Sequence, residues 1–165
     1  MIQELFGGWG INWEIFQWIV SNLPKGSTIL ELGSGKASAE LNRYYELYSV
    51  EHAEHYVGMY DTNYIYAPSP DIVKDYNSWY DTAILKEKMP KYDLLLIDGP
   101  DHSLRKNVLT HKDLFDWSKP IIVDDVQEND LLVIAKHIAD EICHRPYQII
   151  QATGDKDSKH FMIIP

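Results

Sequence analysis

The sequence is poor in cysteine, in positive charge and in long apolar runs, and each shortage excludes a class of protein. Cys143 is the only cysteine among 165 residues, so an intrachain disulfide and a cysteine-ligated metal cluster are excluded. The formal charge is −10, which disfavours binding to nucleic acid or to an anionic membrane surface. No apolar run is long enough to cross a bilayer. We therefore expect a cytoplasmic protein without nucleic-acid or membrane partners.

Short apolar runs alternate with segments of helical periodicity along the whole chain. Such alternation predicts a parallel sheet with helices on both faces. The last two apolar runs are separated by too few residues for a parallel crossover, so the final strand should be antiparallel. Strands are predicted at 28–32, 47–50, 64–67, 92–97, 120–123, 147–152 and 160–164, and helices at 13–23 with Asn12 as N-cap, from 37 onward, and at 79–88, 104–115 and 131–143.

These elements predict one α/β domain spanning residues 1–165. Its expected fold is a Rossmann-like, doubly wound sheet of seven strands, preceded by an N-terminal helix. Residues 1–10 contain three glycines and Trp9, and the pattern allows two interpretations: a flexible leader, or a lid in which Trp9 covers a ligand.

A strand, a glycine turn, a helix and a second strand ending in an acid form the layout of a nucleotide-type site. The first strand carries Glu31 and is followed by the turn Gly33, Ser34 and Gly35, while the second strand ends in Glu51. Glycines let the backbone turn tightly and approach a ligand closely. An acid at the tip of the next strand can accept hydrogen bonds from a ribose diol.

Four segments in order carry a resemblance that covers nearly the whole chain. They read LELGSGKAS, YSVEH, YDLLLIDGP and KPIIVDDV. This pattern resembles class I S-adenosylmethionine-dependent methyltransferases. The combination of YSVEH, YIYAP, WYD and YDLLLIDGP, in that order, is especially similar to small bacterial methyltransferases related to the O-methyltransferases. One departure is Ala37, which stands where the family commonly has a third glycine.

The resemblance implies S-adenosylmethionine as cofactor. Glu31 would help to hold the ammonium group, and Glu51 would accept bonds from the ribose hydroxyls. His52 would either pack near the adenine or lie exposed. The implied cofactor site consists of Glu31, Gly33, Ser34, Gly35, Glu51, His52 and Asp98.

The resemblance also implies an acceptor side at the ends of two neighbouring strands. In catechol-type O-methyltransferases, acids there and an amide bind a magnesium ion. Asp98 and Asp124 match the two acids, and Asp125 stands where the amide would be. Two interpretations stay open here: a Mg²⁺ ion bound by these three residues, or a site without metal in which Asp98 contacts the cofactor or caps a helix, while one of the other two acids is solvated.

His102 and Asp98 are the predicted catalytic residues. His102 follows the Asp98 strand and could deprotonate an acceptor, because its unperturbed pKa is near neutrality; the alternative is a surface or capping histidine. Trp79 and Tyr80 would stack on adenine, on an acceptor, or simply belong to the core.

The expected function is methyl transfer from S-adenosylmethionine to a small molecule, at oxygen, by direct in-line displacement. A cofactor-binding module of the same fold without turnover is the first alternative. An NAD-dependent oxidoreductase is the second, although Ser38 replaces the final glycine of its fingerprint. The aromatic-rich N-terminal helix would provide a surface for a homodimer.

Overall fold

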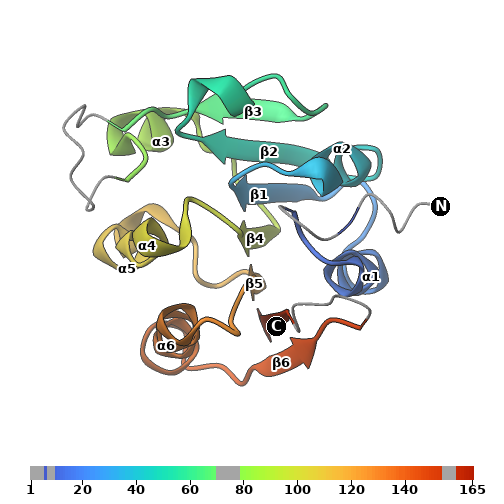
Figure 1. The fold of residues 1–165 in the computed structure, drawn as a ribbon, viewed down its shortest axis with the longest axis vertical. Helices are drawn as coiled ribbons and strands as arrows, with labels where there is room; N and C mark the ends of the chain where they lie inside the picture. The colour runs from blue at the N-terminus through green and yellow to red at the C-terminus, as the bar shows by residue number, and fades with distance from the viewer. Residues whose placement is uncertain (1–5, 7–9, 70–78, 154–158) are drawn as a thin grey trace.

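A single seven-stranded sheet organises the fold. The computed structural model describes residue 6 and residues 10–69, 79–153 and 159–165. Within these residues the strand order is β3-β2-β1-β4-β5-β7-β6 (Figure 1). The strands are β1 (Thr28–Leu32), β2 (Glu46–Glu51), β3 (Asn63–Tyr66), β4 (Leu94–Ile97), β5 (Ile121–Val123), β6 (Gln148–Gln151) and β7 (His160–Ile164).

The pairing of the strands confirms the predicted topology. β3, β2, β1, β4 and β5 pair in parallel, whereas β7 is antiparallel to both β5 and β6. β7 therefore lies between β5 and β6, although it follows both in the chain. All four residues of β4 are buried, as expected for the middle strand of a sheet covered on both faces.

Helices cover both faces of the sheet. In Figure 1, α1 and α2 lie on one side of the sheet, and α3, α4, α5 and α6 lie on the other. The helical segments are α1 (Trp13–Asn22), α2 (Lys36–Asn42), η2 (Glu54–Tyr56), α3 (Thr82–Lys88), α4 (His102–Arg105), α5 (Asn107–Thr110), η3 (Lys112–Leu114), α6 (Asn129–His137) and η4 (Ile138–Cys143), a π-helical continuation of α6.

Alternation along the strands divides the core into two layers. Leu94 and Leu96 of β4 pack in the layer that includes α1 and α2, while Leu95 and Ile97 pack in the layer that includes α3, α5 and α6. Successive strand side chains point to opposite faces, so a strand buried on both faces reads as a continuous apolar run. The two layers hold the carboxyl ends of the strands in fixed positions at one edge.

The structure corrects three local predictions. The predicted helix 104–115 is wrong in its continuity, because the chain forms the three short segments α4, α5 and η3. Apolar spacing reports which residues face the core and does not report whether the helical hydrogen bonds are continuous. The predicted helix 79–88 begins only at Thr82, where Oδ1 of Asp81 accepts bonds from the N–H groups of Ala83 and Ile84.

The third correction concerns Asn12. It stands at the N-cap of α1, but its side chain makes no capping hydrogen bond. Its backbone oxygen accepts bonds from Ile15 N (3.1 Å) and Phe16 N (3.3 Å) instead. The predicted N-cap position of Asn12 is confirmed, and the expected hydrogen bond from a backbone N–H to its side chain is wrong.

Some predictions fall outside the described residues. The leader or lid at 1–10, including Trp9, lies outside them apart from Phe6 and Gly10. Phe6 packs edge-on against Trp13, with ring centroids 5.2 Å apart, so part of the aromatic surface of α1 is covered within the chain. A homodimer through α1 stays a prediction. Among the described helices, none has the length and apolar character needed to span a bilayer.

Candidate functional site

The loops that follow β1, β2 and β4 meet at the carboxyl edge of the sheet. Gly33 N donates to Val50 O (2.9 Å), and Asp98 N donates to Leu32 O (3.1 Å). The side chain of Glu51 reaches the turn after β1. The prediction that Gly33, Glu51 and Asp98 converge on one place is therefore confirmed as geometry.

Two glycines let the loops after β1 and β4 touch through their backbones. A Cβ built on Gly99 would lie 2.7 Å from Cα of Gly33 and 2.9 Å from the carbonyl oxygen of Leu32. Gly33 has φ +88°, a conformation that side chains disfavour, and a Cβ there would lie 3.0 Å from Cα of Gly99. Gly99 was not among the predicted site residues, although a glycine just beyond each of two neighbouring strands is a signal for such a contact.

Glu51 is bonded to the glycine turn. Its Oε1 atom accepts hydrogen bonds from the backbone N–H and from the hydroxyl of Ser34, both at 2.7 Å. The residue is buried, with 3% of its surface exposed. The carboxylate thus stands beside the turn, where the sequence pattern predicted an acceptor for ribose hydroxyls.

Glu31 is buried and is linked to the glycine turn through the hydroxyl of Ser38. Its Oε2 atom accepts bonds from the hydroxyls of Ser38 (2.8 Å) and Ser49 (2.6 Å). The Ser38 oxygen in turn accepts the N–H of Gly35 at 2.9 Å. Burial raises the pKa of Glu31 to about 7, although the two serine hydrogen bonds oppose the rise. These contacts give Glu31 a positioning role within the protein.

Three carboxylates gather at the ends of β4 and β5, as predicted. One oxygen each from Asp98, Asp124 and Asp125 lies within 4.8 Å of the others. Burial raises the pKa of Asp98 to about 7. Burial, together with the negative charges of Asp98 and Asp125, raises the pKa of Asp124 well above its usual range. The alternative in which Asp124 or Asp125 is solvated is wrong, because their exposed fractions are 1% and 6%.

Arg105 is the residue of this cluster that the sequence argument missed. It projects from α4, is 4% exposed, and places its guanidinium against the carboxylates. Both Nη atoms lie 3.2 Å from Oδ2 of Asp125, and Nη2 lies 3.7 Å from Oδ1 of Asp98. Arginine side chains on helices are usually exposed to solvent, so the sequence around Arg105 contains no signal that this residue is buried.

His102 is joined to the same cluster. Its Nε2 atom lies 3.0 Å from Oδ2 of Asp125, and its side chain is 51% exposed. Burial alone would raise the pKa of Asp125, but Arg105 and the other donors around it hold that pKa below its usual value. An ionised carboxylate therefore orients His102 while one face of the imidazole stays open to solvent.

Solved structures share this architecture at low sequence identity. Precorrin-8W decarboxylase from Methanobacterium thermoautotrophicum matches with a TM-score of 0.60 and 13% identity, covering 98% of this chain and 92% of the other. Precorrin-6Y C5,15-methyltransferase from Geobacter metallireducens gives 0.61 and 11%, covering 92% and 87%. An O-methyltransferase from Bacillus cereus, in complex with SAH, gives 0.60 and 16%, covering 90% and 77%. No protein-family model and no curated protein sequence matches the chain.

The chain has the class I S-adenosylmethionine-dependent methyltransferase fold. Identities this low establish the fold and leave activity to be argued from the site. In an open α/β sheet of this kind, ligands bind outside the carboxyl ends of the strands. The glycine turn, Glu51 and the acidic cluster all stand at that edge of this methyltransferase fold.

The buried Tyr80 and the half-buried His52 of the methyltransferase fold each hold a buried polar atom without a partner among the described residues. Among the residues that the structure describes, the hydroxyl of Tyr80 and Nδ1 of His52 have no hydrogen-bond partner, and the two rings lie 5.8 Å apart. Burial raises the pKa of Tyr80 well above its usual range, and the charge of Glu51 acts in the same direction. An unpaired buried hydroxyl costs roughly 1–3 kcal/mol, so a ligand or water at this place would relieve it.

A divalent metal fits the carboxylates by chemistry but does not fit their surroundings. Asp124 uses Oδ1 to accept the N–H of Asp125 (2.9 Å), and Asp125 is engaged by Arg105, by His102 and, at 3.7 Å, by Lys159. These contacts occupy carboxylate oxygens that a metal would need, and the positive charges of Arg105 and Lys159 reduce the attraction of the cluster for a divalent ion. The Mg²⁺ prediction is thus opposed by the protein's own cations, and no reaction step below uses a metal.

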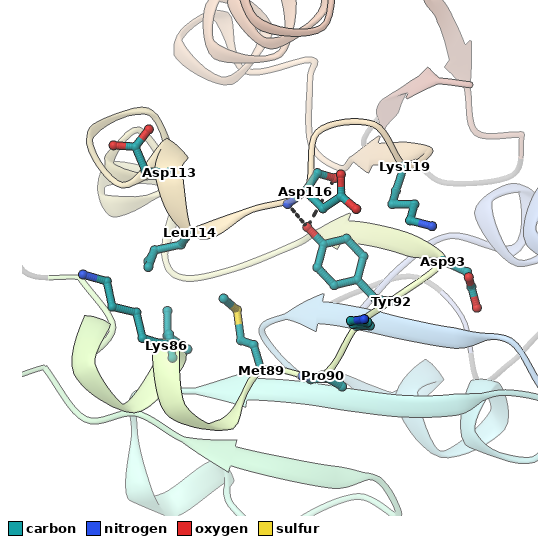
Figure 2. A pocket seen from close by; sticks show the side chains of 11 residues that line it. Lys86, Met89, Pro90, Tyr92, Asp93, Asp113, Leu114, Asp116 and Lys119 are labelled. Carbon is teal, nitrogen blue, oxygen red and sulfur yellow. Dashed lines mark hydrogen bonds between the residues drawn. The ribbon is translucent and has the colours of Figure 1, made fainter.

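One cavity lies away from these residues. It has a volume of about 770 Å³ and lies between the end of α3, η3 and the segments that lead into β4 and β5 (Figure 2). Tyr92 and Lys119 of its lining precede β4 and β5, so it belongs to the amino ends of the strands. A smaller cavity of about 370 Å³ adjoins His102 and the start of α6 at the carboxyl edge. We assign the chemistry to the carboxyl edge because the acids, the glycine turn and the unpaired polar atoms meet there.

Proposed function

We propose that the protein is an S-adenosylmethionine-dependent methyltransferase that acts on a small molecule at an oxygen atom. One observation carries the proposal: the buried carboxylate of Glu51 is bonded to Ser34 of the glycine turn, at the ligand-binding edge of this fold. A carboxylate there suits the two hydroxyls of a ribose, because it offers acceptor oxygens only.

The cofactor half of the site consists of the glycine turn and the buried residues around it. Glu51 accepts from the ribose, and the turn of Gly33, Ser34 and Gly35 lies along the cofactor. Glu31 keeps that turn in place through Ser38, and its charge helps to hold the ammonium group directly or through water.

The buried aromatic side supplies further partners for the cofactor. Nδ1 of His52 and the hydroxyl of Tyr80 offer hydrogen bonds that no atom of residues 6, 10–69, 79–153 or 159–165 takes up. Asp98 stands between the cofactor half and the acceptor half, and it serves both.

The acceptor half centres on His102. A ring nitrogen of His102 removes the proton from the acceptor hydroxyl, directly or through one water molecule. The acceptor oxygen then forms a bond to the methyl carbon while the carbon–sulfur bond breaks, and the electron pair stays on sulfur as a thioether. Positioning of the two reactants supplies most of the acceleration. Asp125 orients His102 through the 3.0 Å contact to Nε2.

Calorimetry with S-adenosylmethionine tests the cofactor half. We expect the wild type to bind and Glu51→Gln to bind roughly tenfold to hundredfold more weakly, because hydrogen bonds to charged groups contribute about 1.5–3 kcal/mol. Glu46→Gln is the matched control, since Glu46 stands at the opposite, exposed end of the same strand. Absence of binding by the wild type at millimolar cofactor would contradict the proposal.

Turnover is tested separately with methyl-labelled cofactor and a panel of phenols, sugar hydroxyls and other small alcohols. We expect label in an oxygen-linked methyl group, and we expect His102→Gln to lower turnover while leaving cofactor affinity within about twofold. Tight cofactor binding without transfer to any acceptor would favour the alternative of a binding module without turnover.

A further inference from the structure

All five N–H groups of the buried Arg105 guanidinium are used. Nε donates to Pro100 O (3.1 Å), and Nη1 donates to Asp124 O (3.3 Å) and to Oδ2 of Asp125 (3.2 Å). Nη2 donates to Asp98 O and to the same Oδ2 atom (3.2 Å). A guanidinium has five donors in a fixed plane, so this arginine has no donor left for solvent. It joins α4 to the ends of β4 and β5 as a fixed part of the site.

The guanidinium also lies where positive charge is needed. Three carboxylates within 4.8 Å of one another repel each other when ionised, and a divalent cation is one way to relieve that repulsion. Arg105 supplies charge at this place from within the chain, 3.2 Å from Asp125 and 3.7 Å from Asp98. Lys159 adds a second positive charge, 3.7 Å from Oδ1 of Asp125.

We propose that Arg105 is the resident cation of this acidic cluster and takes the place of a divalent metal there. Arg105 is then a positioning residue: it holds Asp125 in place, and Asp125 holds His102. The inference concerns the same site as the proposed function, but its test is metal binding, so it stands or falls independently of methyl transfer.

The test measures binding of Mn²⁺ by electron paramagnetic resonance, because bound Mn²⁺ loses the sharp signal of the free ion. We expect the wild type to leave millimolar Mn²⁺ free. Arg105→Gln removes the charge and should bind one Mn²⁺, with an affinity at least about tenfold above that of the wild type. Adding Asp124→Asn to Arg105→Gln should abolish that binding, which would place the ion among the carboxylates.

Two controls separate charge from structure. Arg105→Lys keeps the positive charge and should not gain Mn²⁺ binding. Arg145→Gln makes the same substitution at an arginine that bonds the backbone oxygens of Trp117 and Lys119, away from the acidic cluster, and it should not gain binding either. Circular dichroism establishes that each variant is folded.

The wild-type measurement decides the inference even if Arg105→Gln does not fold. Submillimolar binding of one Mn²⁺ by the wild type, lost in Asp124→Asn, would overturn it. A folded Arg105→Gln variant that binds no Mn²⁺ would also overturn it, because the guanidinium would then not be occupying the position of a metal.

Discussion

Replacing Gly99 by alanine should separate the two loops on which the site is built. The new Cβ would lie 2.7 Å from Cα and 2.9 Å from N of Gly33, and 2.9 Å from the oxygen of Leu32. All three atoms are backbone atoms at the ends of paired strands, so no side chain can rotate away. Overpacking costs typically 1–3 kcal/mol, and we expect Gly99→Ala to reach about 3 kcal/mol, a fall in Tm of roughly 10 °C at this chain length.

Urea unfolding and calorimetry with S-adenosylmethionine measure the two consequences of Gly99→Ala. Gly26→Ala is the control: Gly26 has φ +82° with nothing within 4 Å of a new Cβ, so that variant bears conformational strain of about 1–2 kcal/mol without a clash and should bind cofactor normally. Gly99→Ala should lower cofactor affinity as well as stability. If Gly99→Ala is no more destabilising than Gly26→Ala, the backbone contact is not as close as described and the reasoning fails.

Two further predictions concern buried polar groups. Burial raises the pKa of Glu31 from 4.5 to about 7, so the folded state binds the proton more tightly than the unfolded state does. The free energy of unfolding should therefore fall by about 3 kcal/mol as the pH rises from 4.5 through about 7 and Glu31 ionises. Urea unfolding below and above this pH range measures the fall, and Glu31→Gln should abolish most of it. If the variant shows the same pH dependence of stability as the wild type, the raised pKa of Glu31 is contradicted. Tyr80→Phe removes a buried hydroxyl that has no partner in the part of the chain that the structure describes. The substitution should stabilise the ligand-free protein by about 1 kcal/mol and weaken cofactor binding by roughly tenfold. Thermal unfolding with and without cofactor measures both effects, and unchanged affinity would remove Tyr80 from the site.

The sheet could be predicted because its strands are coded locally. β1 occupies Thr28–Leu32 as expected, since a strand covered on both faces must be apolar at nearly every position. β4 begins at Leu94 rather than at the predicted residue 92, because Tyr92 and Asp93 belong to the segment before it. Antiparallel pairing of β7 followed from the few residues available for a crossover.

The site could be predicted only where its residues follow strands. Glu51 and Asp98 stand at strand ends, and the carboxyl ends of parallel strands share one edge, so their convergence could be inferred. The burial of Arg105 depends on carboxylates that are brought to it by β4 and β5, and helical spacing contains no information about them. The contact of Gly99 with Gly33 likewise depends on the register of neighbouring strands, in which Leu32 stands opposite Ile97.

The place of β7 in the sheet affects the order in which the protein can assemble during translation. β6 emerges from the ribosome before β7, yet within the described residues β6 pairs with β7 alone. A nascent chain that has not reached residue 160 therefore holds β6 as an unattached segment and leaves one side of β5 open to pairing with other chains. β6 can join the sheet only once β7 has been made, which places completion of the sheet late in synthesis.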